Sequence, residues 1–208
     1  MSYPNIIYGD FGDEKVAQST KIGNLPLGAL MILPDGSKFR HARMSATAGV
    51  AGNSYQQNSM AVIAGSADAA FNGTLAMAAS AAIGAKTVSV TMGGTASVSK
   101  DLLADGYLFV AGSAGIGHTY RIKGNTVAAS TTATTITLVD NDPIKVALAA
   151  ASTKVGVRQN NYDNLTITTA DTVGVGALAG VLPVAASASF YCWIQRSGPA
   201  AWITDGST

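Results

Sequence analysis

Hydrophobic and polar residues alternate with a period of two through much of the second half of the chain. In residues 86–92, valine and methionine alternate with threonine and serine, and in residues 119–124 Tyr120 and Ile122 alternate with polar residues. In residues 106–112, the aromatic residues Tyr107 and Phe109 alternate with the aliphatic residues Leu108 and Val110. This period places successive side chains on opposite faces of a β-strand. Further short segments of this kind are residues 134–139, 144–148, 155–159, 165–169 and 173–177, with Gly, Asn, Asp and Thr between them. Many short strands separated by turns predict an antiparallel sandwich or barrel.

The last segment, residues 189–203, alternates clearly and contains both tryptophans, Trp193 and Trp202. Ser-Gly-Pro at residues 197–199 lies between the two tryptophans and is typical of a turn, so the segment predicts a closing hairpin. Because the chain has few charged residues, we expect the two faces of its first strand to have different roles. The face toward the core is Phe190, Cys192 and Ile194, and the face toward a neighbouring subunit in an oligomer is Tyr191, Trp193 and Gln195.

Residues 25–43 predict a second hairpin. Residues 29–33 are apolar, Pro34-Asp35-Gly36 forms a turn in which proline presets φ, and residues 38–43 alternate. Residues 66–82 are the candidate for a short helix, because alanine is abundant and apolar side chains recur on one side. Gly73 lies inside this run and lowers helix stability by about 1 kcal/mol relative to alanine.

The N-terminal residues 1–24 mix Pro, Gly and Asn with apolar side chains and show no sustained period. They predict an arm, and two interpretations stay open: an arm held by a neighbouring surface, or a frayed terminus. Residues 45–60 have no charge and no clean period, so we expect an extended segment that lies across a partner. The candidate surface-binding residues of the arm are Tyr3, Ile6, Ile7, Tyr8 and Phe11.

These patterns together predict a mainly β protein. We expect an antiparallel β-sandwich or barrel-like domain at residues 86–208, preceded by the arm at residues 1–24 and by a region at residues 25–85. That middle region contains the hairpin and an extended Ala/Gly-rich stretch, with at most one short helix. A chain of 208 residues is long enough for one large or two small domains.

Composition narrows the possible partners. Only 12% of the residues are charged, against about 25% in average soluble domains, so much of the surface is neutral and suited to contact with protein. The formal net charge of +1 offers no electrostatic footprint for a nucleic-acid backbone. The N-terminus has acidic residues where a signal peptide needs basic and then apolar ones, and polar residues interrupt the uncharged residues 69–85. We therefore expect no nucleic-acid partner, no secretion signal and no membrane span.

The glycine-rich residues 112–117 do not have the glycine order of a dinucleotide-binding loop, and no Lys-Ser or Lys-Thr follows as in a P-loop. We interpret them as a loop between strands. His41 lies on an otherwise basic strand, and His118 has no acid or nucleophile placed near it by the sequence. We interpret His41 as a surface or cross-strand residue and His118 as a strand-edge residue, and neither as a ligand or base.

The single cysteine, Cys192, excludes an intrachain disulfide and a cysteine-based zinc site, and its alternating context predicts an inert, buried thiol. Residues 140–143, together with Asp163, supply oxygen atoms but lack the further ligands and the terminal Glu of an EF-hand loop. Turns rich in Asp and Asn explain these residues without a metal. The sequence therefore predicts no enzyme, no metal and no cofactor.

Two parts of the chain resemble virion structural proteins of tailed bacteriophages. Leu-Pro-Leu-Gly at residues 25–28, followed by Pro-Asp-Gly-Ser-Lys-Phe-Arg at residues 34–40, is similar to a "P-L-G … D-G-x-x-F-R" hairpin in that group. Residues 190–200, FYCWIQRSGPA, are similar to its "Y-G-W-x-Q-x-x-G-x-A" ending. Cys192 stands where glycine is usual, and His41 where tyrosine is frequent.

The resemblance implies a capsid decoration protein, also called a cement protein. Such proteins are β-rich, commonly homotrimeric, and bind the lattice of the major capsid protein, where they stabilise the mature head. This chain would then be made in the bacterial host cytoplasm and reside on the exterior of the virion capsid. The alternative within the same group is another virion component, such as a head fibre, tail tube or host-binding adhesin. A non-viral β-rich binding module and an enzyme are the remaining hypotheses.

Overall fold

A computed structural model describes residues 6–57, 73–93, 97–168 and 177–203. The fold is mainly β, as the sequence predicts: the described residues form strands β1 to β14 and two three-residue 3₁₀ helices, η1 (Asp13–Lys15) and η2 (Ile22–Asn24). One sheet is mixed, and the other is a nearly closed, barrel-like antiparallel sheet of six strands.

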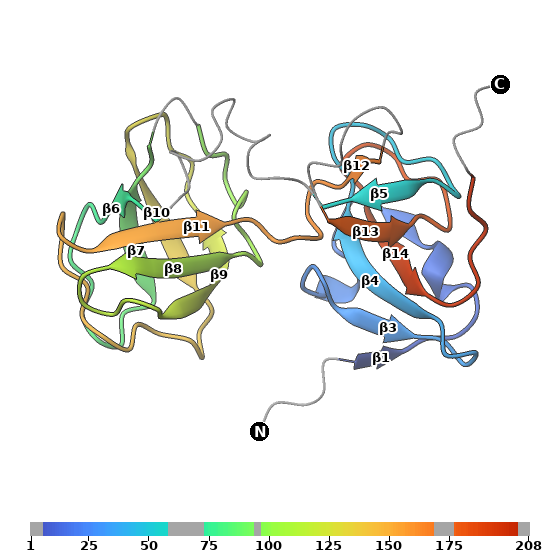
Figure 1. The fold of residues 1–208 in the computed structure, drawn as a ribbon, viewed down its shortest axis with the longest axis horizontal. Helices are drawn as coiled ribbons and strands as arrows, with labels where there is room; N and C mark the ends of the chain where they lie inside the picture. Colours follow the sequence, from blue (N-terminus) through green and yellow to red (C-terminus); the bar gives the residue numbers. More distant parts are fainter. Residues whose placement is uncertain (1–5, 58–72, 94–96, 169–176, 204–208) are drawn as a thin grey trace. The chain divides into compact units, whose positions relative to one another are not determined.

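The chain divides into two compact units (Figure 1). Unit 1 comprises Met1–Asn58 and Asn161–Thr208, and unit 2 comprises Ser59–Asn160. Unit 2 is therefore inserted between two segments of unit 1. The sequence boundaries at residues 24/25 and 85/86 do not coincide with this division, because residues 86–208 fall in both units. Strand-like alternation of side chains occurs on both sides of residue 160, so the local sequence pattern could not locate the boundary between the two units.

Unit 1 is built on the mixed sheet, in the order β1-β3-β4-β14-β13-β5-β12. β1 pairs in parallel with β3, whereas the other pairs of named strands described in this sheet are antiparallel. A further short strand, β2 (Ala17–Gln18), pairs with β14. The strands are β1 (Ile6–Tyr8), β3 (Leu30–Ile32), β4 (Lys38–Arg43), β14 (Tyr191–Ser197), β13 (Leu178–Val181), β5 (Ser54–Gln56) and β12 (Thr166–Ile167).

The predicted hairpin at residues 25–43 is confirmed as β3 and β4, with the Asp35 carboxylate accepting hydrogen bonds from the N–H and hydroxyl of Ser37 in the turn. The predicted closing hairpin is wrong in its second half, because residues 198–203 form no strand. The interpretation of residues 1–24 as an arm without regular structure is also wrong for residues 6–24. β1 and β2 join the sheet through partners distant in sequence, which a local period cannot reveal.

The segment at residues 45–60, expected to extend across a partner, belongs to unit 1 over residues 45–57, and residues 58–60 lie outside the described part. Gly49 and Ala186 form a β-bridge in which the N–H of each donates to the carbonyl oxygen of the other. β5 pairs with β12 and β13. Tyr55 is buried, and its hydroxyl accepts the Val50 N–H at 2.7 Å. This burial raises the pKa of Tyr55 above its ordinary value.

Both faces of β14 are covered. One face adds Cys192 and Ile194 to a cluster of buried apolar side chains, whereas the other adds Trp193 to a separate cluster. β14 thus lies between two small cores, which explains why it is central to unit 1. The first cluster is Ala42, Met44, Tyr55, Leu165, Ala179, Leu182, Ala186, Cys192 and Ile194, and the second is Met31, Leu33, Phe39 and Trp193.

Unit 2 is the six-stranded antiparallel sheet, in the order β6-β11-β8-β9-β10-β7. The two end strands approach each other through a bridge between Met77 and Val90, with the Ala78 N–H donating to Ser89 O at 2.8 Å. This contact nearly closes the sheet around its own core, as in a small barrel. The strands are β6 (Leu75–Ala76), β11 (Lys154–Arg158), β8 (Tyr107–Gly112), β9 (Thr119–Asn125), β10 (Ala133–Leu138) and β7 (Thr87–Thr91).

Three local predictions differ in unit 2. Residues 73–82 of the helix candidate form β6 and bridges rather than helix, and residues 66–72 lie outside the described part. β7 pairs with β10, while Val98 bridges Ala128, so the described residues after Gly93 do not form a hairpin with β7. Residues 144–148 form no strand and contribute one bridge, between Leu148 and Ala81.

Candidate interaction surface

The acidic residues considered as metal ligands make structural contacts. Asp140 Oδ2 accepts a hydrogen bond from Lys123 Nζ at 2.9 Å, and this hydrogen bond lowers the pKa of the Asp140 carboxyl. Asp142 Oδ2 accepts the backbone N–H of Arg121 at 2.8 Å. Among the residues described, no three His, Cys, Asp or Glu side chains are grouped so that they could hold a metal ion.

Asp163 forms a two-pronged ion pair with Arg43 of β4. Arg43 Nε donates to Asp163 Oδ1 at 2.5 Å and a terminal guanidinium nitrogen donates to Oδ2 at 2.8 Å, with the Asp163 side chain almost fully buried. Burial by itself lowers the pKa of Arg43, but attraction to the Asp163 carboxylate and the hydrogen bonds with it together have the larger effect, so the pKa of Arg43 is raised above its ordinary value. Asp163 follows closely on Asn161, where the chain re-enters unit 1. The pair therefore fastens the returning segment to β4.

Neither histidine occupies a reactive setting. His41 is fully buried on β4, which corrects its interpretation as a surface residue, although its place in a strand pair agrees with the cross-strand alternative. Its Nδ1 lies 3.2 Å from Pro26 O, and its ring packs against those of Tyr191 and Trp193. His118 stacks on Tyr120 with ring centroids 6.0 Å apart. Both rings serve packing.

Cys192 is buried, as the sequence predicts, and burial raises the pKa of its thiol to about 12. The thiolate is the reactive form of cysteine, so this side chain is a poor nucleophile at neutral pH.

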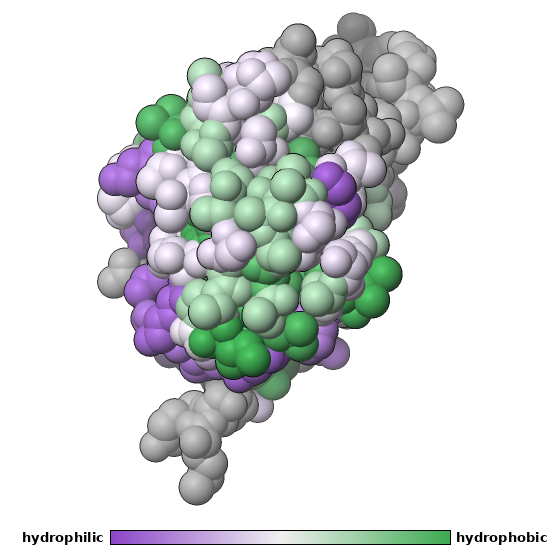
Figure 2. Space-filling model, turned by 90° about the vertical axis from the view of Figure 1, so that its left-hand side faces the viewer, coloured by the Kyte–Doolittle hydropathy of each residue, from purple (hydrophilic) through white to green (hydrophobic). Residues whose placement is uncertain are grey.

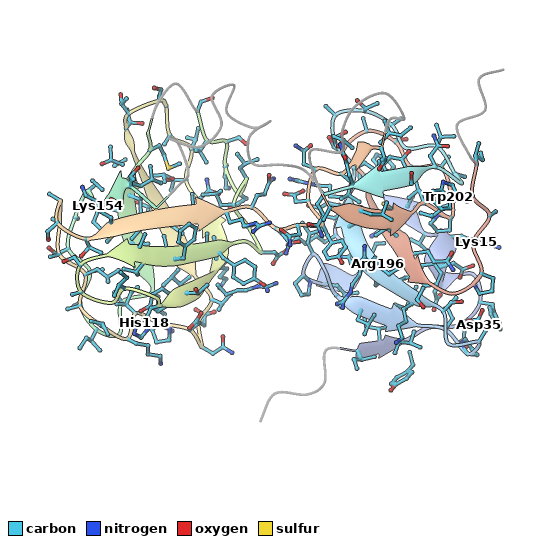
Figure 3. The ribbon with its side chains drawn as sticks, viewed as in Figure 1. Lys15, Asp35, His118, Lys154, Arg196 and Trp202 are labelled. Atoms are coloured by element: carbon cyan, nitrogen blue, oxygen red, sulfur yellow. The ribbon has the colours of Figure 1, made fainter. Side chains whose placement is uncertain are left out.

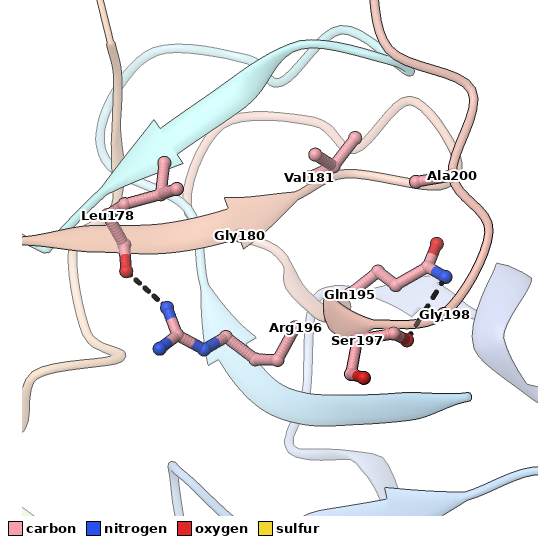
Figure 4. A pocket seen from close by; sticks show the side chains of 8 residues that line it. All are labelled: Leu178, Gly180, Val181, Gln195, Arg196, Ser197, Gly198 and Ala200. Atoms are coloured by element: carbon pink, nitrogen blue, oxygen red, sulfur yellow. Dashed lines mark hydrogen bonds between the residues drawn. The ribbon is translucent and has the colours of Figure 1, made fainter. Parts of the chain in front are cut away.

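A surface pocket of about 300 Å³ lies between β13 and the end of β14 (Figure 4). The Arg196 guanidinium donates to the main-chain oxygens of Leu178 and Ala179, and Gln195 Nε2 donates to Pro199 O at 2.8 Å. These donors are directed to the protein's own carbonyl groups. The described residues that line the pocket include the Ser197 hydroxyl but no His, Cys, Asp, Glu or Lys side chain that could activate it.

The two stretches on which the expected family resemblance rests contribute neighbouring strands to unit 1. β4, from the first stretch, pairs with β14, from the last, and Trp193 lies opposite His41 while Gln195 lies opposite Phe39. About 150 residues separate the two strands in sequence, and unit 2 is inserted between them. The strands β4 and β14, to which the two stretches contribute, are therefore neighbours in one sheet.

The three residues predicted to face a neighbouring subunit lie within unit 1. Trp193 is only 2% exposed and packs with Met31, Leu33 and Phe39, so it is a core residue. Gln195 is buried and bonded to Pro199 O. Tyr191 is half-buried, with the Arg43 guanidinium 5.8 Å from its ring centroid. The period of two separated the faces of β14 correctly but could not show that both faces are covered.

The predicted arm residues lie at the β1 edge of the unit 1 sheet, except Tyr3, which lies outside the described residues. Ile7 points into the core cluster of Trp193, while Tyr8 is 81% exposed and Ile6 is also exposed. Phe11 follows in the next turn and is 69% exposed. β1 is an end strand of the sheet. An edge strand flanked by exposed aromatic side chains is a suitable site for a protein partner.

The turn that presents Phe11 is held by its own acidic residues. The Asp10 N–H donates to Asp13 Oδ2 at 2.9 Å, and the Gly12 N–H donates to Glu14 Oε2 at 2.6 Å. Gly12 has φ of 111°, a conformation that side-chain-bearing residues rarely adopt. Phe11 therefore sits on an ordered turn and not on a loose arm.

A second exposed apolar group in unit 1 was not found from sequence. Trp202 and Ile203 lie near the turn at Val50, because the Ile203 N–H donates to Gly52 O at 2.9 Å. Trp202 is 61% exposed (Figure 3). The two halves of this group are about 150 residues apart in sequence, so no local signal could have joined them.

Comparison with protein-family models, with curated proteins and with solved structures gives no significant match. Within the described ranges, no helix has the length and hydrophobicity needed to cross a bilayer.

Proposed function

We propose that this protein is a non-enzymatic phage capsid decoration protein that binds the lattice of the major capsid protein and stabilises the mature head. The observation that carries the proposal is the pairing of β4 with β14. The two stretches that resemble virion proteins are distant in sequence, yet they form adjacent strands of one sheet. If both stretches belong to one structural element shared with virion proteins, their strands should be neighbours, and the pairing of β4 with β14 meets that expectation.

The β1 edge supplies the surface for this contact. Tyr8 and Phe11 offer large apolar side chains, whose burial contributes about 1.5–3 kcal/mol each, and an end strand can add a neighbouring chain through backbone hydrogen bonds. A protein that binds only the assembled lattice stabilises that lattice by mass action. Binding itself is then the function, and no catalytic group is required.

The test is co-sedimentation with expanded capsids that lack the protein. The variant Tyr8→Ser/Phe11→Ser removes two exposed side chains and leaves β1 in place. Deleting residues 1–24 would also remove β1 and β2, so loss of binding would then be hard to interpret. The matched control is Val127→Ser, which changes an exposed apolar residue of unit 2.

We expect the double variant to bind capsids at least about tenfold more weakly than wild type, given the apolar area it removes. The Val127→Ser control should bind like wild type. Equal binding by all three proteins would refute the role of the β1 edge. Failure of the wild type to bind, or its binding to tails instead of capsids, would refute the proposed function and favour the tail tube, head fibre or adhesin alternative.

A further inference from the structure

The pocket between β13 and β14 forms where these two strands separate (Figure 4). Val181 and Gln195 are paired in the sheet, and at Gly180 the strands are so close that a Cβ would collide with the main-chain oxygen of Gln195. The register of β14 against β4 then shifts between Gln195 and Ser197. From this point the Arg196 side chain, and not the backbone of β14, bonds to β13.

Arg196 joins the separated strands through one of its three guanidinium nitrogens. Nη1 donates to the main-chain oxygens of Leu178 and Ala179, to the second of them at 2.9 Å. Among the described residues, none accepts a hydrogen bond from Nε or Nη2 of Arg196. These two nitrogens form one edge of the planar guanidinium, and their parallel N–H groups match the two oxygens of a carboxylate.

The ion pair between Arg43 and Asp163 shows this edge of a guanidinium with its carboxylate. Arg43 Nε donates to one oxygen of Asp163 at 2.5 Å, and Arg43 Nη2 donates to the other at 2.8 Å. Arg196 has the same two nitrogens available, but no Asp or Glu of the described chain pairs with it. Arg196 therefore offers a carboxylate-binding edge that the fold itself does not use.

The remaining lining of the pocket suits one carboxylate on a short apolar stem. Ser197 contributes a hydroxyl, and Leu178, Val181 and Ala200 contribute apolar side chains. The described lining has no acidic residue and no basic residue besides Arg196, so its single positive charge matches a carboxylate better than a phosphate of nearly two charges. A volume of about 300 Å³ is near the lower limit for small-molecule pockets and fits a group of side-chain size.

The pocket is formed before any ligand arrives. Gln195 Nε2 donates to Pro199 O at 2.8 Å, which holds the turn that forms one wall. Gly198 in this turn has φ of 99° and packs so closely on Ser37 that a Cβ would collide with it. Arg196 is held in turn by two carbonyl groups of β13. Because these groups are already ordered, little conformational freedom is lost on binding.

We infer that this pocket binds a carboxylate group, carried either by an acidic side chain of a protein or by a small organic acid. Arg196 Nε and Nη2 donate to its two oxygens, the Ser197 hydroxyl donates to one of them, and its stem packs on the apolar lining. The inference does not rest on capsid binding, since it concerns the protein alone in solution.

The experiment follows the backbone amide resonances of the full chain by NMR while one probe at a time is added. The probes are the capped peptide acetyl-Ala-Glu-Ala-amide, its neutral counterpart acetyl-Ala-Gln-Ala-amide, glutarate and inorganic phosphate. Unit 2 is the internal control, because it has exposed apolar residues of its own, including Ile83 and Ile116. Figure 2 faces unit 2 and shows several hydrophobic groups on its surface. A probe held only by apolar contact should shift amides of unit 2 as well.

Two variants test the polar groups of the pocket. Arg196→Lys keeps the charge and removes the two-nitrogen edge. Its matched control is Arg40→Lys, because Arg40 Nη1 also donates to a main-chain oxygen, that of Gly28 at 2.7 Å, but Arg40 does not line the pocket. Ser197→Ala removes an exposed hydroxyl and leaves Arg196 bonded to β13, so it tests the pocket even if Arg196→Lys disturbs the fold. Its matched control is Ser187→Ala, an exposed serine of unit 1 outside the pocket.

We expect the Glu peptide and glutarate to shift amides of residues 178–181 and 195–200 saturably, and the Gln peptide to bind about tenfold more weakly or not at all. Arg196→Lys should weaken carboxylate binding about tenfold and Ser197→Ala about threefold, while both controls bind like wild type. Tighter binding of the Glu peptide than of glutarate indicates a protein-borne carboxylate, and the reverse indicates a small acid.

Four results would overturn the inference. The first is that neither carboxylate probe binds at about 10 mM. The second is that the Gln peptide binds as well as the Glu peptide, or that phosphate binds more tightly than both carboxylates. The third is that the amide shifts are as large in unit 2 as around the pocket. The last is that Arg196→Lys and Ser197→Ala both bind like wild type.

Discussion

Trp193→Ala distinguishes a core tryptophan from an interface tryptophan. Trp193 is 2% exposed and packs with three other buried residues, Met31, Leu33 and Phe39. Removing a buried tryptophan side chain costs about 3–5 kcal/mol, because apolar burial is lost and a cavity remains. The total stability of a domain is about 5–15 kcal/mol. The substitution should therefore remove a large part of the stability of unit 1.

Unit 2 should be unaffected, because its core cluster consists only of its own residues, from Leu75 to Val157. The matched control is Trp202→Ala, the chain's other tryptophan, which is largely exposed and should change stability by less than about 0.5 kcal/mol. Hydrogen exchange resolved by residue is the suitable assay, since it reports the two units separately. In Trp193→Ala, protection should fall across β3, β4 and β14 and persist in β8 to β10.

The reasoning would be refuted by either of two results. Equal protection in Trp193→Ala and Trp202→Ala would show that Trp193 contributes no core packing. If Trp193→Ala lost its oligomers while the amides of unit 1 stayed fully protected from exchange, Trp193 would be an intersubunit contact, as the sequence predicted.

Two further predictions concern unit 1. Asp163→Ala leaves the Arg43 guanidinium without its carboxylate and should lower stability by about 3 kcal/mol in denaturant unfolding; a change below about 0.5 kcal/mol would contradict a structural role for the pair. Cys192, with a thiol pKa of about 12 in the fold, should resist a disulfide reagent at pH 8 and react once the chain is unfolded. The thiol of the unfolded chain ionises at a lower pH than the buried thiol does. The contribution of the buried Cys192 thiol to folding stability is therefore complete below pH 9 and declines as the pH rises from 9 toward 12. Rapid labelling of the folded protein would contradict the burial of Cys192.

Strands with a local period could be predicted from the sequence. Alternation located β8, β9, β10 and β14 to within one or two residues, and the Pro34-Asp35-Gly36 turn located the β3–β4 hairpin. Each of these signals is contained in neighbouring residues. The mainly β fold class followed from them.

Features that depend on distant residues could not be predicted. β1 has three residues and a parallel partner, and β13 contains Gly180 at φ of 147°, so neither shows a strand pattern of its own. The burial of Trp193 depends on cluster neighbours that are distant in sequence, Met31, Leu33 and Phe39. The insertion of unit 2 leaves no mark in composition, because alternating strands lie on both sides of it.

The candidate surfaces, too, could be predicted from the sequence only in part. The exposed aromatic residues Tyr8 and Phe11 were evident in the sequence as apolar side chains in an irregular stretch, although the ordered turn that holds Phe11 was not. In unit 2, the barrel brings together three runs without charged residues, at residues 78–84, 111–117 and 146–152. Each run is visible in the sequence, but their contact is a property of the fold.

The central claim is that this protein resides on the outer surface of a phage head. Under the proposed function the gene belongs to a phage, so electron cryomicroscopy of purified phage particles with and without the protein tests this claim most directly. We predict extra density on the exterior of the capsid lattice into which both β units fit, with the β1 edge of unit 1 against the major capsid protein. Density on the tail, or the absence of the protein from particles, would contradict the claim.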